Sequence, residues 1–515
     1  MTVLKFSFKI ILQLVFVIIF FSTLYAKNPE KFNQGNHISN YFSGILLLND
    51  NQYEKSYKYL KELDGLEENH ITYSSKYLSS LVNSGRLSEA FKYSKQLEKK
   101  KLGNFESELI IIIYYLKNNN YDLAQRYFLK IKKRKSRVLI NNFISSSLVN
   151  WISFKDTDLE TAKNMINDMD SSFENLKSIQ NIFLHSYYES KKSEYYFENL
   201  TSNDKIDFSR YNYFYAKYLS FKGNDEKAKK VVNFSIKQHP RNLLLKQYKL
   251  DLHSDKEQNN FDFQNLSHVI AEILYIIANA LSSQDDFNSS NFYLNLSKYL
   301  NKNFHPFDLL LAENFYRIGN FKKAKKIYDR IGRKGEAYYW FSTKQNSRIL
   351  IEDGKKEKAL TTISNAFEKL SEKSIYIKFD YARFLKNNDQ YESSIELYTE
   401  IIQKIKKDHP LYPKSTDGRG VAYERIGDWD KAEKDLLSSL DAKPNQAYVI
   451  NYLAYSWIEK GIKIDQSLKM LKKAHNLEIN DPYIIDSLGW ALFKLKRYEE
   501  SKKYLQLAVI IMPAD

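Results

Sequence analysis

The stretch DPYIIDSLGWALFKLKRYEESKKYLQLAVIIMP, residues 481–513, decides the fold of this chain. Numbering from Pro482 as position 1 puts Gly489 at position 8, Ser501 at position 20 and Ala508 at position 27. Small residues at these positions allow two antiparallel helices to approach closely, and large apolar residues between them fill the remaining space. The stretch therefore predicts one helix–turn–helix unit of about 34 residues.

The same pattern recurs along most of the chain in one frame. The units before Pro482 begin at Ala447 and Pro413, with spacings of 35 and 34 residues. Earlier units begin near His37, Ile71, Phe105, Phe143, Ser209, Ala271, His305, Trp340 and Ile375, with a degenerate unit at 178–208. Because one unit cannot bury its apolar face alone, we expect about 13 units to stack into an all-α solenoid, a right-handed superhelix.

The repeat frame breaks once, after the unit that begins at Ser209, because the next unit begins 62 residues later. Residues 243–252 predict one further helix, and the segment HSDKEQNNFDFQ at 253–264 is polar without helical periodicity. We interpret 253–264 as a linker between an N-terminal repeat block at 27–252 and a C-terminal repeat block at 265–515.

Residues 1–26 have the order of a secretory signal. Lys5 and Lys9 precede an apolar run at 10–21, and Leu-Tyr-Ala at 24–26 ends the segment. The run is shorter than the roughly 20 apolar residues of a membrane-spanning helix. We predict cleavage after residue 26 and export to the periplasm, and an uncleaved membrane anchor is the alternative. No later segment is expected to span a membrane.

The residue types required for catalysis or metal binding are missing or wrongly spaced. The chain has no cysteine, which excludes disulfides, thiolate metal sites, thiol catalysis and acylation of an N-terminal cysteine. None of the nine histidines stands in a metal-binding spacing, and the sequence has no phosphate-binding loop or nucleophile elbow. We therefore predict no enzymatic activity, no catalytic or metal-binding residues and no cofactor.

The formal net charge is +16, and the cations are spread along the chain. One denser group consists of Lys130, Lys132, Lys133, Arg134, Lys135 and Arg137. We interpret this group as cations at a helix C-terminus, which the helix dipole favours. Peripheral contact with an anionic membrane or with peptidoglycan is the alternative. Behind an export signal, a nucleic-acid partner is not expected.

Three segments carry a family resemblance: DGRGVAYERIGDWDKAEKDL at 417–436, VINYLAYSWIEKGIKID at 449–465 and DPYIIDSLGWALFKLKRYEESKKYL at 481–505. They resemble tetratricopeptide-repeat (TPR) proteins, and NYLAYSW and DSLGWAL are similar to the large exported TPR proteins of alphaproteobacteria. The resemblance implies a bacterial envelope protein without a catalytic domain. Such proteins usually continue beyond this point, so we expect either a truncated chain or a partner that covers the last helix.

The resemblance to TPR folds also implies which residues face a concave groove, namely positions 2, 5, 9, 12 and 13 of the first helix in each unit. In the last two units these groove positions hold Tyr448, Asn451, Tyr455, Tyr483, Asp486, Trp490, Phe493 and Lys494. In the two preceding units they include Arg383, Lys386, Asp417, Glu424 and Arg425. Aromatic and arginine side chains are the usual hot spots of interfaces, so we predict a groove for peptides with apolar anchors and some acidic character. Alternatively, Tyr455 and Trp490 pack between neighbouring repeats.

These observations favour a non-catalytic scaffold or adaptor of the cell envelope that binds protein or peptide partners in the groove. Two other classes stay open. One is a helical-repeat protein that binds RNA, although such proteins lack the L-G-x2-Y signature of the first helix. The other is a cell-wall or polysaccharide factor, whose enzymatic form would need a clustered pair of acids that the sequence does not offer.

Overall fold

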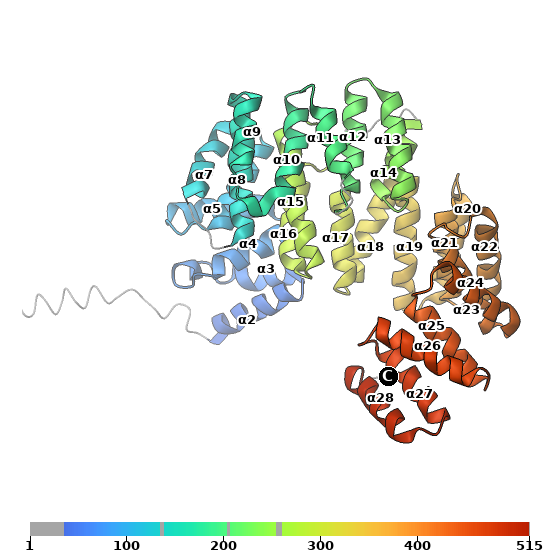
Figure 1. The fold of residues 1–515 in the computed structure, drawn as a ribbon. Helices are drawn as coiled ribbons and strands as arrows, with labels where there is room; N and C mark the ends of the chain where they lie inside the picture. Colours follow the sequence, from blue (N-terminus) through green and yellow to red (C-terminus); the bar gives the residue numbers. More distant parts are fainter. Residues whose placement is uncertain (1–34, 134–137, 203–205, 254–259, 514–515) are drawn as a thin grey trace, which may run out of the picture. The chain divides into compact units, whose positions relative to one another are not determined.

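The computed structural model describes residues 35–133, 138–202, 206–253 and 260–513, which form 27 α-helices and, within these ranges, no strand (Figure 1). Twenty-six of these helices make 13 consecutive helix–turn–helix pairs, and α14 stands alone between α13 and α15. The predicted all-α repeat fold of about 13 units is therefore confirmed. The predicted signal sequence lies outside the described residues.

The helices of the first half are α2 Gly35–Asn49, α3 Tyr53–Lys61, α4 Tyr73–Asn83, α5 Leu87–Lys99, α6 Phe105–Lys117, α7 Tyr121–Lys133, α8 Leu139–Ser153, α9 Leu159–Asn167, α10 Glu174–Tyr187, α11 Ser193–Thr201, α12 Ser209–Phe221, α13 Asp225–Gln238 and α14 Leu243–His253. The helices of the second half are α15 Leu266–Ser283, α16 Phe287–Leu300, α17 Pro306–Arg317, α18 Phe321–Ile331, α19 Glu336–Glu352, α20 Lys356–Lys369, α21 Ile375–Lys386, α22 Tyr391–Lys404, α23 Tyr412–Arg425, α24 Trp429–Ala442, α25 Ala447–Glu459, α26 Ile464–Leu477, α27 Pro482–Lys494 and α28 Tyr498–Ile511.

Positions 8 and 20 of the repeat face each other within a pair, as the sequence predicts. A Cβ atom on Gly489 would lie 2.8 Å from the side chain of Leu505, so only glycine fits this helix crossing without displacement. Ser501 at position 20 donates a hydrogen bond to the carbonyl oxygen of Gly489 at 2.8 Å. The same bond joins Ser394 to the carbonyl oxygen of Ala382 at 3.0 Å. Close helix contact within a pair thus rests on small residues that also satisfy each other's polar groups.

The described residues form two compact units that divide between Tyr338 and Tyr339, inside α19. This division differs from the predicted linker at 253–264. In the described part of that segment, Phe261 and Phe263 are each only 2% exposed and pack among the aromatic side chains of the first unit. Two buried phenylalanines therefore anchor a stretch whose polar composition suggested a linker.

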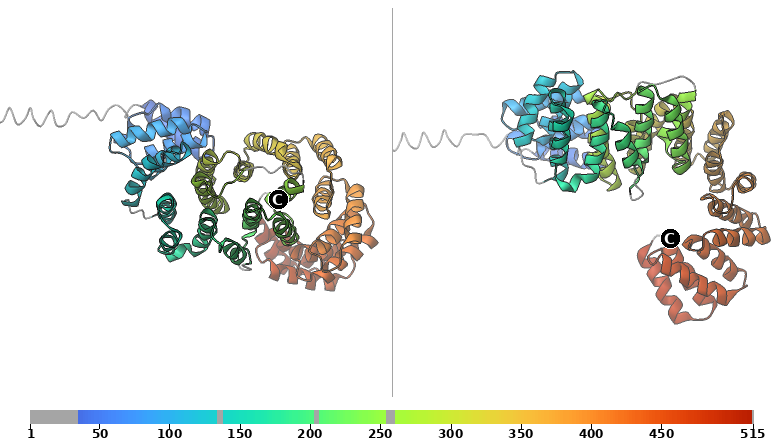
Figure 2. Two further views of the ribbon diagram at one scale, coloured as in Figure 1. Left: turned by 90° about the horizontal axis from the view of Figure 1, so that it is seen from above. Right: turned by 45° about the horizontal axis from the view of Figure 1, so that its top comes forward.

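In the first unit, α15 and α16 pack against α4, α6 and α8, which lie far earlier in the chain (Figures 1 and 2). Side-chain hydrogen bonds fix this packing. The amide of Asn83 donates to Oδ1 of Asn288 at 3.0 Å. The hydroxyl of Ser267 donates to the carbonyl oxygen of Leu116 at 3.2 Å. The first unit is consequently held together by long-range contacts in addition to the stacking of neighbouring pairs.

Helix α15 has the most apolar composition of the helices in this unit. By length and composition it is the one helix among the described residues that could span a membrane, which corrects the expectation that no later segment would qualify. However, 67% of its 18 residues are buried inside the protein, so a core helix accounts for its composition. Its buried Glu272 forms two hydrogen bonds with Arg210 of α12, at 2.6 and 2.8 Å. The guanidinium group of Arg210 also lies 3.9 Å from the ring centre of Tyr275.

The second unit is built from neighbouring contacts. Its stronger helix contacts join helices that are adjacent or next but one in the chain, from α21 and α22 through to α27 and α28. Its buried clusters are correspondingly local: Leu436, Val449, Leu453 and Trp457 form one of them, between α24 and α25. This arrangement is that of a repeat array in which each pair stabilises the next.

Candidate functional site

In helix α6 of the first unit, the groove positions are covered by the chain itself. In α6 these positions include Leu109, Ile113 and Leu116, which are at most 1% exposed. Helices α15 and α16 cover this face of α6. Lys117, the last groove position of α6, donates a hydrogen bond to the carbonyl oxygen of Leu300 in α16 at 3.0 Å. This part of the predicted groove is therefore core.

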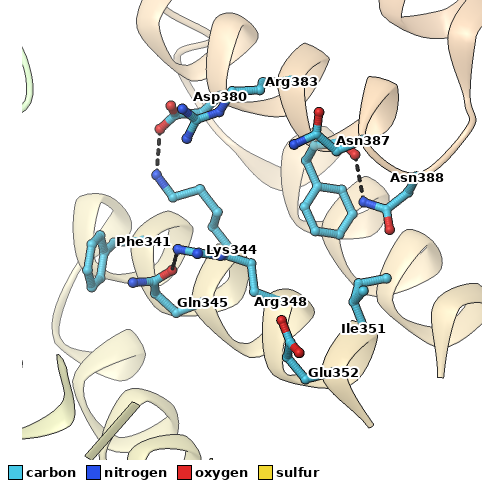
Figure 3. A pocket seen from close by; sticks show the side chains of 11 residues that line it. Phe341, Lys344, Gln345, Arg348, Ile351, Glu352, Asp380, Arg383, Asn387 and Asn388 are labelled. Atoms are coloured by element: carbon cyan, nitrogen blue, oxygen red, sulfur yellow. Dashed lines mark hydrogen bonds and ion pairs between the residues drawn. The ribbon is translucent and has the colours of Figure 1, made fainter. Parts of the chain in front are cut away.

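In the second unit, the groove positions of two successive first helices line a cavity of about 470 Å³ between α19 and α21 (Figure 3). From α19 the lining residues are Phe341, Lys344, Gln345, Arg348, Ile351 and Glu352. From α21 they are Asp380, Arg383, Phe384, Asn387 and Asn388. Of this set, only Arg383 was predicted from the sequence. The same spacing rule, applied to the unit that begins at Trp340, selects five of the α19 residues and would have found them.

The charged side chains of this cavity are unequally engaged. Lys344 pairs with Asp380 at 2.6 Å on one side of the cavity (Figure 3). Arg348 donates a hydrogen bond to the neutral side chain of Gln345 at 3.2 Å. Arg383 is exposed and has no ion pair with any residue in the described ranges. The cavity lining thus contains an uncompensated guanidinium group together with the apolar, partly buried side chains of Phe341 and Ile351.

Further along the groove, charged residues that the sequence predicted on α21 and α23 interact electrostatically. Burial raises the pKa of Asp417 to about 6, and the charge of Lys386 opposes that rise. Burial also lowers the pKa of Lys386, whose electrostatic neighbours include Arg383 and Arg425. Groups with such perturbed titration in a concave surface are typical of functional sites, although structural charge networks share the property.

The other predicted charges of α23 contact the next repeat. Arg425 is exposed and lies 3.7 Å from Glu424. Glu424 accepts a hydrogen bond of 2.8 Å from the hydroxyl of Tyr452 in α25. Tyr452 was not predicted as a groove residue, since it stands at position 6 of its unit. Its hydroxyl nevertheless joins the charged and aromatic parts of the groove.

The groove positions of α25 and α27 form an exposed aromatic row. Tyr448, Tyr455 and Tyr483 are 64%, 38% and 56% exposed. Tyr448 donates a hydrogen bond of 2.6 Å to Asp481, the N-cap of α27, and so links the two helices. Asn451, between the first two tyrosines, has a buried Oδ1 without a hydrogen-bond partner in the described part of the chain. The side chains of these three tyrosines are accessible to solvent, and their role in binding a partner stays a prediction.

The row ends in a cluster at the C-terminus of α27. The rings of Trp490 and Phe493 are stacked, with centres 5.4 Å apart, and Lys494 lies 4.8 Å from the ring centre of Trp490. Trp490 is also packed against the buried cluster that contains Ala454 and Leu488. Trp490 therefore has a packing role, as one interpretation of the sequence predicted, whereas Phe493 is exposed. Asp486, between these residues and Tyr483, is exposed as well.

Two other features considered from the sequence are metal binding and the basic group at 130–137. Within the ranges described above, no three His, Asp or Glu side chains are arranged to hold a metal ion. Of the basic group at 130–137, Lys130 contacts Glu98 and lies 4.5 Å from the ring centre of Tyr127. The remaining side chains of that group lie outside those that the structure describes, so neither interpretation of the group is tested.

Comparison with known proteins matches residues 484–511 to the family model described as tetratricopeptide repeat. A curated TPR repeat-containing protein of Pseudomonas aeruginosa is 26% identical over 162 residues, or 31% of this chain. The matched region is 27% of that relative's length.

Two solved structures illustrate the structural neighbours. A chain of the APC/C hetero-tetramer Cut9–Hcn1 is 13% identical, with a TM-score of 0.34, over 89% of this chain and 96% of that chain. YrrB, described as a TPR protein with an unusual peptide-binding site, is 15% identical, with a TM-score of 0.25, over 34% of this chain and 88% of that chain.

Proposed function

This chain is a tetratricopeptide-repeat protein, and from that premise we propose that it is a non-catalytic scaffold which binds protein or peptide partners in the groove of its second unit. TPR proteins generally mediate protein–protein interactions. We assign this general role to the groove of the second unit.

One observation carries the proposal: equivalent repeat positions are buried in α6 of the first unit and exposed in α25 and α27 of the second. Position 9 is Ile113 in α6, which is buried, and Tyr455 in α25, which is 38% exposed. Soluble proteins rarely leave adjacent large aromatic side chains exposed unless the patch binds something. The exposed row from Tyr448 to Phe493 therefore supports a partner-binding surface.

The composition of the groove supports a peptide or an extended protein segment as its occupant. Tyrosine, tryptophan and arginine are enriched at interface hot spots because they combine a large contact area with polar ends. Tyr455 and Phe493 offer apolar contact, and Arg425 offers a guanidinium group. A partner with apolar anchors close to acidic residues would satisfy both.

A mutational test distinguishes binding from packing. We expect Tyr455→Ala and Arg425→Ala each to weaken partner recovery, with a cost of about 2 kcal/mol for a hot spot, and to leave the melting temperature unchanged. Trp490→Ala should lower both, because Trp490 also packs on the core. Leu437→Ala is a matched control, since Leu437 is 42% exposed on the second helix of its pair.

The measurement is affinity purification of the full chain from envelope extracts with quantitative mass spectrometry, together with thermal unfolding of each variant. Unchanged recovery of all partners by Tyr455→Ala and Arg425→Ala would refute the groove as the binding surface. A lower melting temperature for Tyr455→Ala with recovery intact would show that this side chain is core.

We further propose that the protein acts in the periplasm and that it enters through the signal at residues 1–26. The support is the Lys-flanked apolar run at 10–21. Fractionation and N-terminal sequencing of the mature protein test this. A mature chain that begins after residue 26 is expected, whereas a full-length chain confined to the cytosol would overturn export.

A further inference from the structure

The first unit contains a pocket in addition to the covered face of α6. The pocket has a volume of about 470 Å³ and is lined by residues from α10, α12, α14, α15 and α17. Arg210, Tyr275 and Leu309 line it from groove positions 2, 5 and 5 of their repeats. All of its lining residues belong to the first unit, so it is separate from the groove that we propose as the partner-binding surface.

Most of the pocket wall is apolar. Phe208 and Leu244 are 8% and 7% exposed, and Ile276, Leu309 and Leu310 are partly exposed. Apolar pockets of roughly 300–1,000 Å³ that contain only a few polar groups are typical of sites for small molecules. The size and the wall of this pocket therefore suit a small ligand with an apolar body.

One charged pair supplies the main polar group of the pocket. Nε and Nη2 of Arg210 donate hydrogen bonds to the two carboxylate oxygens of Glu272, at 2.6 and 2.8 Å. Nη1 of Arg210 has no hydrogen-bond partner among the residues that the structure describes, and 20% of the side chain is exposed. Glu272 is fully buried and does not line the pocket, so a ligand can reach the guanidinium group and not the carboxylate.

The guanidinium group of Arg210 is held in place by aromatic rings as well as by Glu272. It lies 3.9 Å from the ring centre of Tyr275 and 5.3 Å from that of Phe304. Phe304 is itself buried and contacts the ring of Phe214. A donor that is already fixed before a ligand arrives loses little conformational entropy on binding. Arg210 is therefore a preorganised hydrogen-bond donor.

The charges around the pocket disfavour an ionic ligand. The charge of Glu272 compensates that of Arg210, so the pair is neutral as a whole. The other charged residues of the lining, Asp207 and Glu313, are acidic and would repel an anion. A cation would be repelled by the accessible guanidinium group. An uncharged molecule avoids both repulsions, and an oxygen atom on it can accept a hydrogen bond from Nη1.

We propose that this pocket binds an uncharged small molecule that has an apolar body and a carbonyl or hydroxyl oxygen at one end, and that Nη1 of Arg210 donates a hydrogen bond to this oxygen. The apolar wall contributed by α14, α15 and α17 contacts the body of the ligand. The site is independent of the proposed partner-binding groove, because no residue is shared between them.

The uncharged naphthyl ketone prodan is a fluorescent probe with this chemistry, because its emission shifts to shorter wavelengths in apolar surroundings. Prodan is titrated with the full chain and then displaced by four competitors that share the naphthalene ring. These are an uncharged ketone, a hydrocarbon of the same size, a carboxylate and an ammonium compound. A hydrogen bond to a charged group contributes about 1.5–3 kcal/mol, so we expect the ketone to bind at least tenfold more tightly than the other three.

Matched variants connect the binding of prodan to the pocket. Leu309→Trp fills the pocket from α17 and should weaken binding at least tenfold. Leu129→Trp makes the same change on α7, at a leucine that is 58% exposed and lies outside the pocket lining, and should leave binding unchanged. The double variant Arg210→Met with Glu272→Leu leaves no buried carboxylate unpaired, and it should bind the ketone and the hydrocarbon equally. Circular dichroism and thermal unfolding show whether each variant is folded.

Each contrary result removes a defined part of the proposal. Prodan binding that Leu309→Trp leaves unchanged would overturn the pocket as the site. Equal affinities of the unaltered chain for the ketone and the hydrocarbon would overturn the hydrogen bond from Arg210. Tightest binding of the carboxylate or the ammonium compound would overturn the preference for an uncharged ligand. Failure of all four competitors and of prodan to bind would overturn the site altogether, and it would leave the proposed function of the second unit untouched.

Discussion

The two units contain helices that use the same repeat positions in opposite ways. In the first unit the groove positions of α6 are apolar and lie beneath α15 and α16, so the chain fills its own groove. In the second unit the corresponding positions of α25 and α27 hold tyrosines that remain exposed. The repeat therefore specifies where a surface faces, and the side chains at five positions decide whether that surface becomes core or stays exposed.

The difference is also visible in the polar groups that accompany each surface. Between α4 and α16, neutral amide side chains form hydrogen bonds with each other, such as the bond from Asn83 to Asn288. In the groove of the second unit, charged groups are left without close partners, as Arg383 is in the described ranges. Satisfied neutral contacts suit a permanent interface, and unpaired charges suit one that forms and dissociates.

The largest expected effect comes from truncating matched positions in the two units. Ile113→Ala removes a buried side chain and should cost about 2–5 kcal/mol of unfolding free energy. Tyr455→Ala at the same repeat position should change it by less than about 0.5 kcal/mol, since its side chain is exposed. Differential scanning calorimetry of both variants makes the comparison. Equal losses would mean that Tyr455 is part of a core and would remove the distinction between the two grooves.

A smaller effect concerns acid sensitivity of the first unit. His185 is 2% exposed, both of its ring nitrogens lack hydrogen-bond partners in the described ranges, and its ring stacks on Tyr196. Burial, followed by the charges of Lys163 and Lys192, lowers its pKa to about 4. The unfolded state then binds more protons than the folded state between about pH 4 and 6.5, so stability is lost as pH falls through that window.

Replacing His185 isolates this contribution. His185→Phe keeps a ring that can stack on Tyr196 and removes the titrating group. At pH 4.5 the variant should retain about 2 kcal/mol more of its neutral-pH stability than the unaltered chain does, from the shift of 1.36 kcal/mol per pKa unit. Urea unfolding at pH 7 and pH 4.5 measures the difference, and parallel pH profiles for both proteins would contradict it.

The smallest effect has the opposite sign and lies in the groove of the second unit. The pKa of Asp417 is raised by burial to about 6, so the folded state binds more protons than the unfolded state between about pH 4 and 6. Its charge thus destabilises the fold once pH rises through that range. Asp417→Asn should stabilise the chain by about 1 kcal/mol at pH 7, which is less than the roughly 3 kcal/mol of the full pKa shift because the side chain is only partly buried, and by less at pH 4. Unchanged stability at pH 7 would show that Lys386 fully compensates the buried carboxylate.

The sequence predicted the repeats well because the signal for each unit is local. Gly489 and Ser501, for example, are 12 residues apart, and their contact follows from the spacing alone. The packing of α15 against α6 has no such signal, because it joins segments separated by more than 150 residues. The apolar composition of α6 and α15 indicated that both helices are buried. It did not indicate that they pack against each other.

Prediction of the candidate site was also limited to what local spacing in the sequence determines. Groove positions could be assigned from the repeat spacing, and two residues assigned in this way, Tyr455 and Arg383, are exposed. The cavity between α19 and α21 was not predicted, because groove positions were assigned only from the unit that begins at Ile375 onward. The dual environment of Trp490 depends on how closely α25 and α27 approach, which composition and spacing do not determine.

The filling of the first groove by α15 and α16 has a consequence for the order of folding. Asn83 and its partner Asn288 are separated by 205 residues, and at roughly 5–20 residues per second their synthesis is about 10–40 s apart. From its own synthesis until α15 and α16 are made, the face of α6 that these helices cover stays open. Contacts this distant in sequence form slowly, whereas each pair of the second unit can dock on its neighbour as soon as it is made. The nascent first unit is therefore the segment in which we expect chaperones to bind and aggregation to begin.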